Sequence, residues 1–287
     1  MALSANLRGA ILALTAFGLY ALYDVTTKYL GGAYSPLQVL FVAGTFALPM
    51  VLAQLLTLGG GLRPVLPGWM ALRVVVALVN GVLGAYAFAV LPLAEAYAVF
   101  FTMPLLIALL GVPMLGEAMD LRRGLAILAG LVGVIVALRP GQVPVTAGHL
   151  AALAAAALGA ANYVILRRTG GIERPVVLMF WPMLVQWAAT GLAMPFVWTP
   201  MPLPHLGLSL LMAVELVAGG LVIIAAYRAA PVIVVAPMQY SQILWGVLFG
   251  TLLFAETLDL PTAIGIGIII ASGLVILTHR PHVENRA

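Results

Sequence analysis

Residues 69–90 read WMALRVVVALVNGVLGAYAFAV, and this stretch decides the fold class. It carries a single charge, at Arg73, and has about the 20 residues that a helix needs to cross a hydrocarbon core. Nine more apolar blocks of similar character surround it. The ten blocks cover residues 9–30, 36–58, 69–90, 93–115, 121–138, 147–167, 175–198, 206–228, 232–254 and 261–278. The sequence therefore predicts an all-α integral membrane protein with ten transmembrane helices.

The composition of the whole chain supports this prediction. Of its 287 residues, 64% are hydrophobic and only 8% are charged, against about 25% charged residues in a typical soluble domain. Such a chain has too little polar surface to cover itself in water, so we expect the lipid bilayer as its surroundings. The sequence pI of about 9.6 fits arginines on one side of a membrane, and no nucleic-acid partner is expected. The absence of cysteine excludes disulfides and thiolate chemistry.

An internal repeat divides the chain into two units. When the sequence is shifted by 139 residues, six of the sixteen glycines before residue 140 fall on glycine. Pro36 then falls on Pro175, and Pro92 falls on Pro231. We predict one unit over residues 1–140 and a second over 141–287, each with five helices. Because five is odd, the second unit must enter the membrane upside down, an arrangement that recurs in secondary transporters around a central site.

The arginines test this inverted arrangement, because cytoplasmic loops of membrane proteins are enriched in Lys and Arg. With the N-terminus in the cytoplasm, eleven basic residues lie at the cytoplasmic ends and loops and two lie on the other side. The eleven are Arg8, Arg63, Arg73, Arg122, Arg123, Arg167, Arg168, Arg174, Arg228, Arg280 and Arg286, and the two are Lys28 and Arg139. We therefore expect a multi-pass protein of a bacterial inner membrane with both termini in the cytoplasm.

Acidic residues inside predicted spans are functional candidates, because an ionisable group in a membrane must be paired or hydrated. Asp24 could bind a substrate amine or a proton, or it could pair with Lys28 one turn away. Glu215 could line a cavity, or it could be a protonated acid with a structural hydrogen bond. Glu95 lies beside the Pro92 corner, where we expect water to reach it.

Polar and aromatic side chains gather on the predicted spans 9–30, 69–90, 93–115, 147–167, 206–228 and 232–254. Interhelical hydrogen bonds alone could account for them, but a shared central cavity explains better why they concentrate on these spans. Gln239 and Gln242 lie on one helical face, which must point into the protein because lipid cannot hydrate two amides. The predicted substrate-binding residues are Tyr20, Tyr23, Asp24, Asn80, Tyr97, Phe101, Asn162, Tyr163, Glu215, Gln239, Gln242 and Trp245.

The spans 121–138 and 261–278 have glycines in place of central polar groups, which favours close helix packing. We interpret them as a scaffold that packs within the chain or between two copies, so a homodimer stays open. Asp120 and Asp259 precede these spans and are predicted N-caps. No spacing typical of a catalytic site, a metal site or a phosphate-binding loop appears. We therefore expect no enzyme activity, no metal and no cofactor.

Several short motifs resemble those of a known family. Leu91-Pro92-Leu93-Ala94-Glu95-Ala96, Pro104, Leu115-Gly116-Glu117 and the glycine pair Gly130 and Gly133 resemble the EamA repeat of the drug/metabolite transporter superfamily. The second copy is similar through Tyr227–Pro231, Ala255-Glu256 and Ser272-Gly273. The resemblance implies that the six spans rich in polar groups line a transport path and that 121–138 and 261–278 support it. The chain departs from the repeat at Pro104, whose equivalent is Ile243.

The resemblance and the polar cavity together predict a secondary transporter with a small-molecule substrate. Aromatic and amide side chains with little central charge suit an amino acid with an aromatic or apolar side chain, or a related metabolite, exported by alternating access. The resemblance extends to exporters of aromatic amino acids. A multidrug or organic-cation exporter that uses Asp24 or Glu215 is the alternative. A non-coupled channel or a non-transporting scaffold is a third possibility that the sequence leaves open.

Overall fold

A computed structural model of the chain describes residues 5–58, 61–103, 105–107, 109–110, 121–138, 144–169, 172–229 and 236–278, in which every regular element is a helix. The first half contains α1 (Ala5–Gly31), α2 (Pro36–Leu58), α3 (Pro67–Val90), α4 (Leu93–Phe100) and α6 (Leu121–Leu138). The second half contains α7 (Ala147–Thr169), α8 (Pro175–Leu192), α9 (Met194–Val197), α10 (Leu203–Ala229), the 3₁₀ helix η1 (Ala236–Tyr240), α12 (Ser241–Phe254) and α13 (Leu260–Thr278).

The helix starts follow from local chemistry. Pro36, Pro67 and Pro175 open α2, α3 and α8, because proline has no N–H to leave unsatisfied in a first turn. The Asp259 carboxylate accepts a hydrogen bond from the backbone N–H of Thr262 at 3.1 Å. That bond confirms the predicted N-cap of α13. The equivalent Asp120 lies outside the described residues.

Five described helices, α1, α2, α3, α7 and α10, contain stretches long and apolar enough to cross a membrane, and shorter apolar helices accompany them. Two predicted spans are interrupted in the described residues. Span 93–115 is interrupted after Phe100 by a turn; Pro104 lacks the N–H that the carbonyl of Phe100 would need to continue the helix. Span 175–198 divides into α8 and α9 around Ala193, and the described part of span 232–254 begins as a 3₁₀ turn. The ten-helix inverted repeat stays a prediction.

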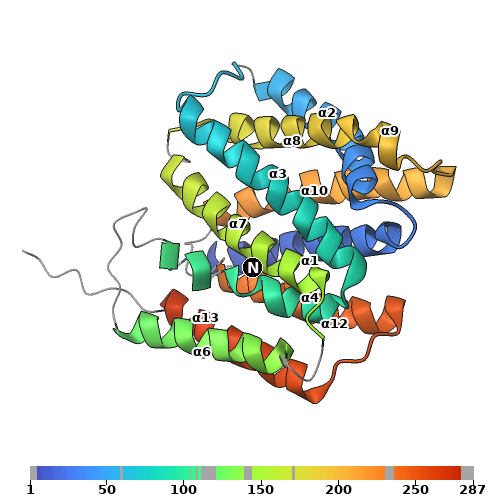
Figure 1. Cartoon of the computed structure of the whole chain (residues 1–287). Helices are drawn as coiled ribbons and strands as arrows, with labels where there is room; N and C mark the ends of the chain where they lie inside the picture. Colours follow the sequence, from blue (N-terminus) through green and yellow to red (C-terminus); the bar gives the residue numbers. More distant parts are fainter. Residues whose placement is uncertain are drawn as a thin grey trace, which may run out of the picture.

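The two helices interpreted as a scaffold pack tightly against each other. α6 and α13 lie side by side at one edge of the bundle, and α2 and α8 lie at the opposite edge (Figure 1). A Cβ atom added at Gly133 would lie 2.9 Å from the carbonyl oxygen of Gly265, so the two backbones are almost in contact. The prediction of close packing within the chain is confirmed, and pairing between two copies stays a prediction.

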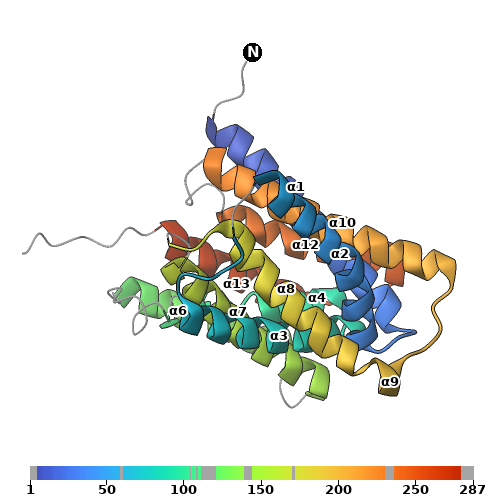
Figure 2. The ribbon, with the colours of Figure 1, turned by 90° about the horizontal axis from the view of Figure 1, so that it is seen from above.

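The other helix pairs match the 139-residue repeat only in part. α1 packs along α10, which Figure 2 shows from above. Its counterpart under the 139-residue shift, α3 against α7, is also extensive. However, α1 contacts α3, whereas the equivalent pair α7 and α10 makes at most marginal contact in the described residues. The bundle is therefore more open between α7 and α10 than between α1 and α3.

The two ends of the long helices differ in their polar contacts. At one end, which we call the Glu173 end, the backbone N–H of Leu66 donates to Glu173 Oε1 at 2.6 Å. At the other, the Glu256 end, Lys28 Nζ lies 3.0 Å from Glu256 Oε1. Large apolar side chains face outward between the ends, for example Leu128 and Leu244, which are 60% and 68% exposed. Such a surface suits lipid, because exposing this much apolar area to water is unfavourable.

Candidate functional site

A cavity of about 400 Å³, here called the central cavity, lies in the middle of the bundle. Small-molecule sites in proteins begin at about 300 Å³. α1, α3, α4, α8, α10, η1 and α12 all contribute to its wall. Seven of the twelve predicted site residues line it: Tyr23, Asp24, Asn80, Tyr97, Phe101, Gln239 and Gln242. The predicted cavity is therefore present, and Asp24 is the only ionisable carboxylate in this wall among the described residues.

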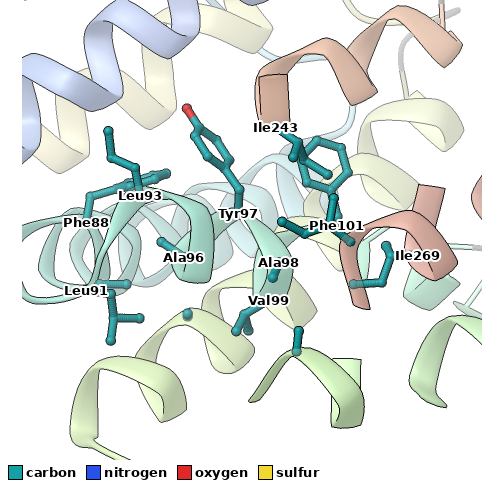
Figure 3. Close-up of a cluster of buried hydrophobic side chains, with 14 of the residues drawn as sticks. Phe88, Leu91, Leu93, Ala96, Tyr97, Ala98, Val99, Phe101, Ile243 and Ile269 are labelled. Carbon is teal, nitrogen blue, oxygen red and sulfur yellow. The ribbon is translucent and has the colours of Figure 1, made fainter. Parts of the chain in front are cut away.

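Tyr97 is the central side chain of one wall. Its hydroxyl donates a hydrogen bond to Asp24 Oδ2 at 2.6 Å and so joins α4 to α1. In Figure 3 this hydroxyl points away from the neighbouring apolar side chains. The ring packs so closely on α12 that a Cβ atom at Gly246 would lie 2.2 Å from it. Glycine at this position therefore allows α4 and α12 to meet beside the central cavity.

Lys28 does not pair with Asp24, so that alternative for Asp24 is wrong. Lys28 Nζ instead pairs with Glu256 Oε1 at 3.0 Å and donates to the Leu91 carbonyl at 2.5 Å. Tyr97 binds one oxygen of the Asp24 carboxylate, and Glu256 lies over the start of α4, where its Oε1 meets Lys28. The Leu93 N–H donates to Glu256 Oε2 at 2.9 Å, a favourable place for a carboxylate at a helix N-terminus.

The backbone at the end of α12 positions this glutamate. Ala255 has a left-handed conformation with φ of 53°, which costs about 1 kcal/mol for a residue with a Cβ atom. The turn brings the Glu256 N–H to the Gly250 carbonyl at 3.0 Å. We call the group formed by Lys28, Glu256 and the backbone of Leu91 and Leu93 the Lys28–Glu256 cluster. It ties α1, the α3–α4 corner and the end of α12 together.

Aromatic and amide groups complete the central cavity on the other side. Phe101 stacks on Tyr240 with ring centroids 5.2 Å apart. Gln239 and Gln242 lie in the lining on either side of Tyr240, so the predicted inward direction of both amides is confirmed. Asn80 of α3 and Gln186 of α8 also line this cavity. A ligand in this cavity would meet aromatic faces, four amides and one carboxylate.

A second cavity of about 480 Å³, here called the vestibule, lies beside the central cavity toward the Glu173 end. The two share Gln186, Leu216 and Gln239 in their walls. Tyr20 and Tyr163, both predicted site residues, line the vestibule and do not line the central cavity. The full vestibule wall also includes Phe17, Arg73, Leu166, Leu178, Met179, Pro182, Met183, Val217, Gly220 and Ile223.

The sequence interpretation missed Gln186, which forms the border between the two cavities. The sequence already pointed to this residue, because a single amide inside the apolar span 175–198 is as costly to place in lipid as the amides of Gln239 and Gln242. A Cβ atom at Gly81 would lie 2.7 Å from Gln186 Oε1, which places the amide directly against α3.

Three predicted site residues do not line either cavity. Glu215 is only 3% exposed, and its neighbour Leu216 takes the position in the wall. Trp245 stacks on Phe249 with centroids 5.8 Å apart and faces Gly18 of α1. Asn162 is likewise absent from both linings. The helix rotation decides these placements, because adjacent residues point about 100° apart. Glu215 Oε2, Trp245 Nε1 and Asn162 Oδ1 are buried without a hydrogen-bond partner among the described residues.

Glu95 lies at the Glu256 end, outside the central cavity. Its carboxylate is 3.4 Å from His149 Nε2. The side chain is 29% exposed, which agrees with the prediction that water reaches it beside the Pro92 corner. It lines a third cavity of about 410 Å³ together with Glu256 and Asp259. Among the described residues, no group of three or more metal-ligating side chains could hold an ion.

Comparison with known proteins adds three findings. Residues 7–139 match the model of the EamA-like transporter family. Two proteins of Helicobacter pylori, from strains ATCC 700392 / 26695 and J99 / ATCC 700824, are each described as an uncharacterized transporter and are 45% identical over 51 residues. This match spans 18% of the chain and 17% of each relative.

A solved crystal structure of a protein shares 22% sequence identity, with a TM-score of 0.65, over 94% of this chain and 95% of that one. At this identity the likeness concerns the fold alone.

Proposed function

Because its first half is of the EamA-like transporter type, we propose that the whole chain is a secondary transporter, working by alternating access. The proposed substrates are amino acids with aromatic or apolar side chains and related small metabolites, exported across a bacterial inner membrane. One observation carries the proposal. The vestibule adjoins the central cavity toward the Glu173 end and shares three wall residues with it, whereas Tyr97 and the Lys28–Glu256 cluster hold α1, α4 and α12 together toward the Glu256 end.

The proposed sidedness follows from the arginines. Arg63, Arg168 and Arg174 lie at the Glu173 end with the loops before α3 and α8. Under the positive-inside rule this end is cytoplasmic. The structure then corresponds to an inward-facing state, ready to take substrate from the cytoplasm. Two inverted five-helix units that rock around the central cavity would produce the outward-facing state.

The proposed substrate class follows from the wall chemistry. Aromatic faces such as Phe88, Phe100 and Phe101 suit an apolar side chain. Asp24 suits an ammonium group, and the amides suit a carboxylate. No Lys or Arg lines the central cavity among the described residues, which argues against phosphorylated substrates, since these need a cation at mid-depth.

Solute counterflow in proteoliposomes tests the proposal. Vesicles loaded with unlabelled phenylalanine should accumulate labelled phenylalanine transiently when they contain the protein. A scaffold gives no uptake, and a channel gives uptake without acceleration by exchange. A screen across amino acids with and without a pH gradient identifies proton coupling. Absence of exchange for every amino acid would contradict the proposal.

An organic-cation exporter remains the second candidate, because Asp24 lies in the cavity wall. Counterflow of methyl viologen, compared with that of phenylalanine, separates the two. Exchange of methyl viologen without exchange of phenylalanine would favour the cation exporter.

A further inference from the structure

Arg73 lies inside the bundle and lines the vestibule. The sequence interpretation counted it among the arginines of cytoplasmic ends and loops. In the structure it is the seventh residue of α3, two turns into a helix that is long and apolar enough to cross the membrane. A cation at this depth is a candidate for ligand binding.

One edge of the guanidinium has a structural partner. Arg73 Nη1 donates a hydrogen bond to the backbone carbonyl of Leu178 on α8. Pro182 lies four residues further along α8 and has no N–H, so the Leu178 carbonyl lacks its helical donor. Arg73 replaces that donor and ties α3 to α8.

The other edge is unused. Arg73 Nε is buried and has no hydrogen-bond partner among the described residues. No described carboxylate forms an ion pair with Arg73 either. A buried guanidinium N–H without an acceptor is unfavourable, because the group has lost water and gained nothing in exchange. Because Arg73 also lines the vestibule, an anion there would relieve this once the side chain turns its Nε edge toward the cavity.

The surroundings indicate which anion fits. The vestibule wall is mainly apolar and contains Phe17, Tyr20, Tyr163 and Met179. A planar carboxylate matches the Nε edge of a guanidinium, which offers parallel N–H donors. The remainder of the ligand must be apolar to suit this wall.

We propose that Arg73 forms an entry subsite that binds the carboxylate of an amphipathic organic acid or zwitterion in the vestibule, with its apolar body against the aromatic wall. This deepens the proposed function and rests on it for the direction of movement. The ligand then passes the border formed by Gln186 and Gln239 and enters the central cavity, where Asp24 faces an ammonium group if the ligand carries one. Arg73 therefore selects for the carboxylate, and Asp24 does not contribute to that selection.

Binding to the detergent-purified protein tests the subsite without relying on transport. Labelled phenylalanine is competed by 3-phenylpropionate, which has the carboxylate without the amine, and by phenethylamine, which has the amine without the carboxylate. In the unaltered protein we expect 3-phenylpropionate to compete and phenethylamine to compete weakly. In Arg73→Gln, binding of 3-phenylpropionate should weaken about tenfold to hundredfold, as loss of a charge-assisted hydrogen bond implies. Phenethylamine should be unaffected.

Two further variants separate recognition from folding. Arg63→Gln removes an exposed arginine before α3 and should leave all three affinities unchanged. Arg73→Lys keeps the charge but loses the planar fork, so it should recover part of the preference for the carboxylate. A purely structural Arg73 would weaken all ligands equally in Arg73→Gln, and that outcome overturns the proposal.

The two proposals can fail separately. If carboxylates bind through Arg73 but no amino acid exchanges in proteoliposomes, the transport proposal fails and the subsite stands. If phenylalanine exchanges normally and Arg73→Gln preserves the preference for carboxylates, the subsite fails alone. If no carboxylate binds the unaltered protein, the subsite is also refuted.

Discussion

The hydroxyl of Tyr97 donates to the carboxylate of Asp24 across the wall of the central cavity, with 2.6 Å between the two oxygens. This bond connects the only described carboxylate in the cavity wall to the side chain that packs on Gly246 of α12. Tyr97 occupies only Oδ2, so a ligand ammonium that binds Asp24 would share this carboxylate with Tyr97. The proposed amine site therefore lies directly beside the side chain that packs on α12.

Asp24→Asn should reduce the affinity for phenylalanine about tenfold and leave that for 3-phenylpropionate unchanged. The amide oxygen still accepts the Tyr97 hydrogen bond, so the wall stays intact while the charge that attracts an ammonium is lost. Competition binding on the purified variant checks this. An equal loss for both ligands would mean that Asp24 shapes the cavity and does not bind the amine.

Breaking the Lys28–Glu256 cluster should open the path toward the Glu256 end. Lys28→Met removes an ion pair whose side chains are 13% and 17% exposed. Loss of such a partly buried pair costs about 1 to 2 kcal/mol, enough for roughly a tenfold change in population. The natural chain has no cysteine, so a single cysteine at Asn80 can report on access to the central cavity. Its reaction with a membrane-impermeant thiol reagent from the Glu256 end should accelerate.

Glu95→Gln serves as the control for the Lys28→Met experiment. It alters a carboxylate at the same end that contacts His149 of α7 and does not join α1 to α12. The labelling rate should stay at that of the parent protein. Equal rates in Lys28→Met and the parent would refute the idea that the cluster closes this end.

Gly265→Ala should lower the thermal stability of the protein in detergent. The added Cβ atom would lie 2.5 Å from the Gly133 carbonyl oxygen and 2.7 Å from the Ala137 nitrogen. Both are backbone atoms of α6, so the helices must separate, at a cost of about 1 to 3 kcal/mol. Gly267→Ala in the same helix meets nothing within 4 Å, and alanine there should be neutral or slightly stabilising. Similar melting temperatures for the two variants would contradict the tight α6–α13 contact.

Gly81→Ala should slow transport without destabilising the fold. Its Cβ atom would displace the flexible Gln186 amide, only 2.7 Å away, at the border between the vestibule and the central cavity. Gly84→Ala adds the same group to the same cavity wall but meets only the edge of Phe100 at 4.0 Å. Counterflow rates and melting temperatures of the two variants are compared. Unchanged transport in Gly81→Ala would exclude this border from the substrate path.

Local patterns predicted most of the helical framework. Span starts at Pro36 and Pro175 agree with the structure, because a proline and an apolar run act on their own segment. The cap at Asp259 was predicted for the same reason. The glycines of α6 and α13 predicted close packing, but not that the two helices pack against each other. The end of α4 at Phe100 was not predicted, because apolar composition alone does not register a change in backbone direction.

Local sequence patterns were not sufficient to predict the contacts of the candidate site. Composition and helical period were enough to predict a helical, membrane-spanning chain with Asp24, Tyr97 and Gln239 at polar positions within spans. The three-dimensional packing was needed to find that Asp24 bonds to Tyr97, 73 residues away, and that Arg73 reaches Leu178, 105 residues away. It also decided that Lys28 pairs with Glu256 instead of its helical neighbour Asp24. Such partners depend on how each helix is rotated and which helix lies beside it, and packing of the whole bundle sets both.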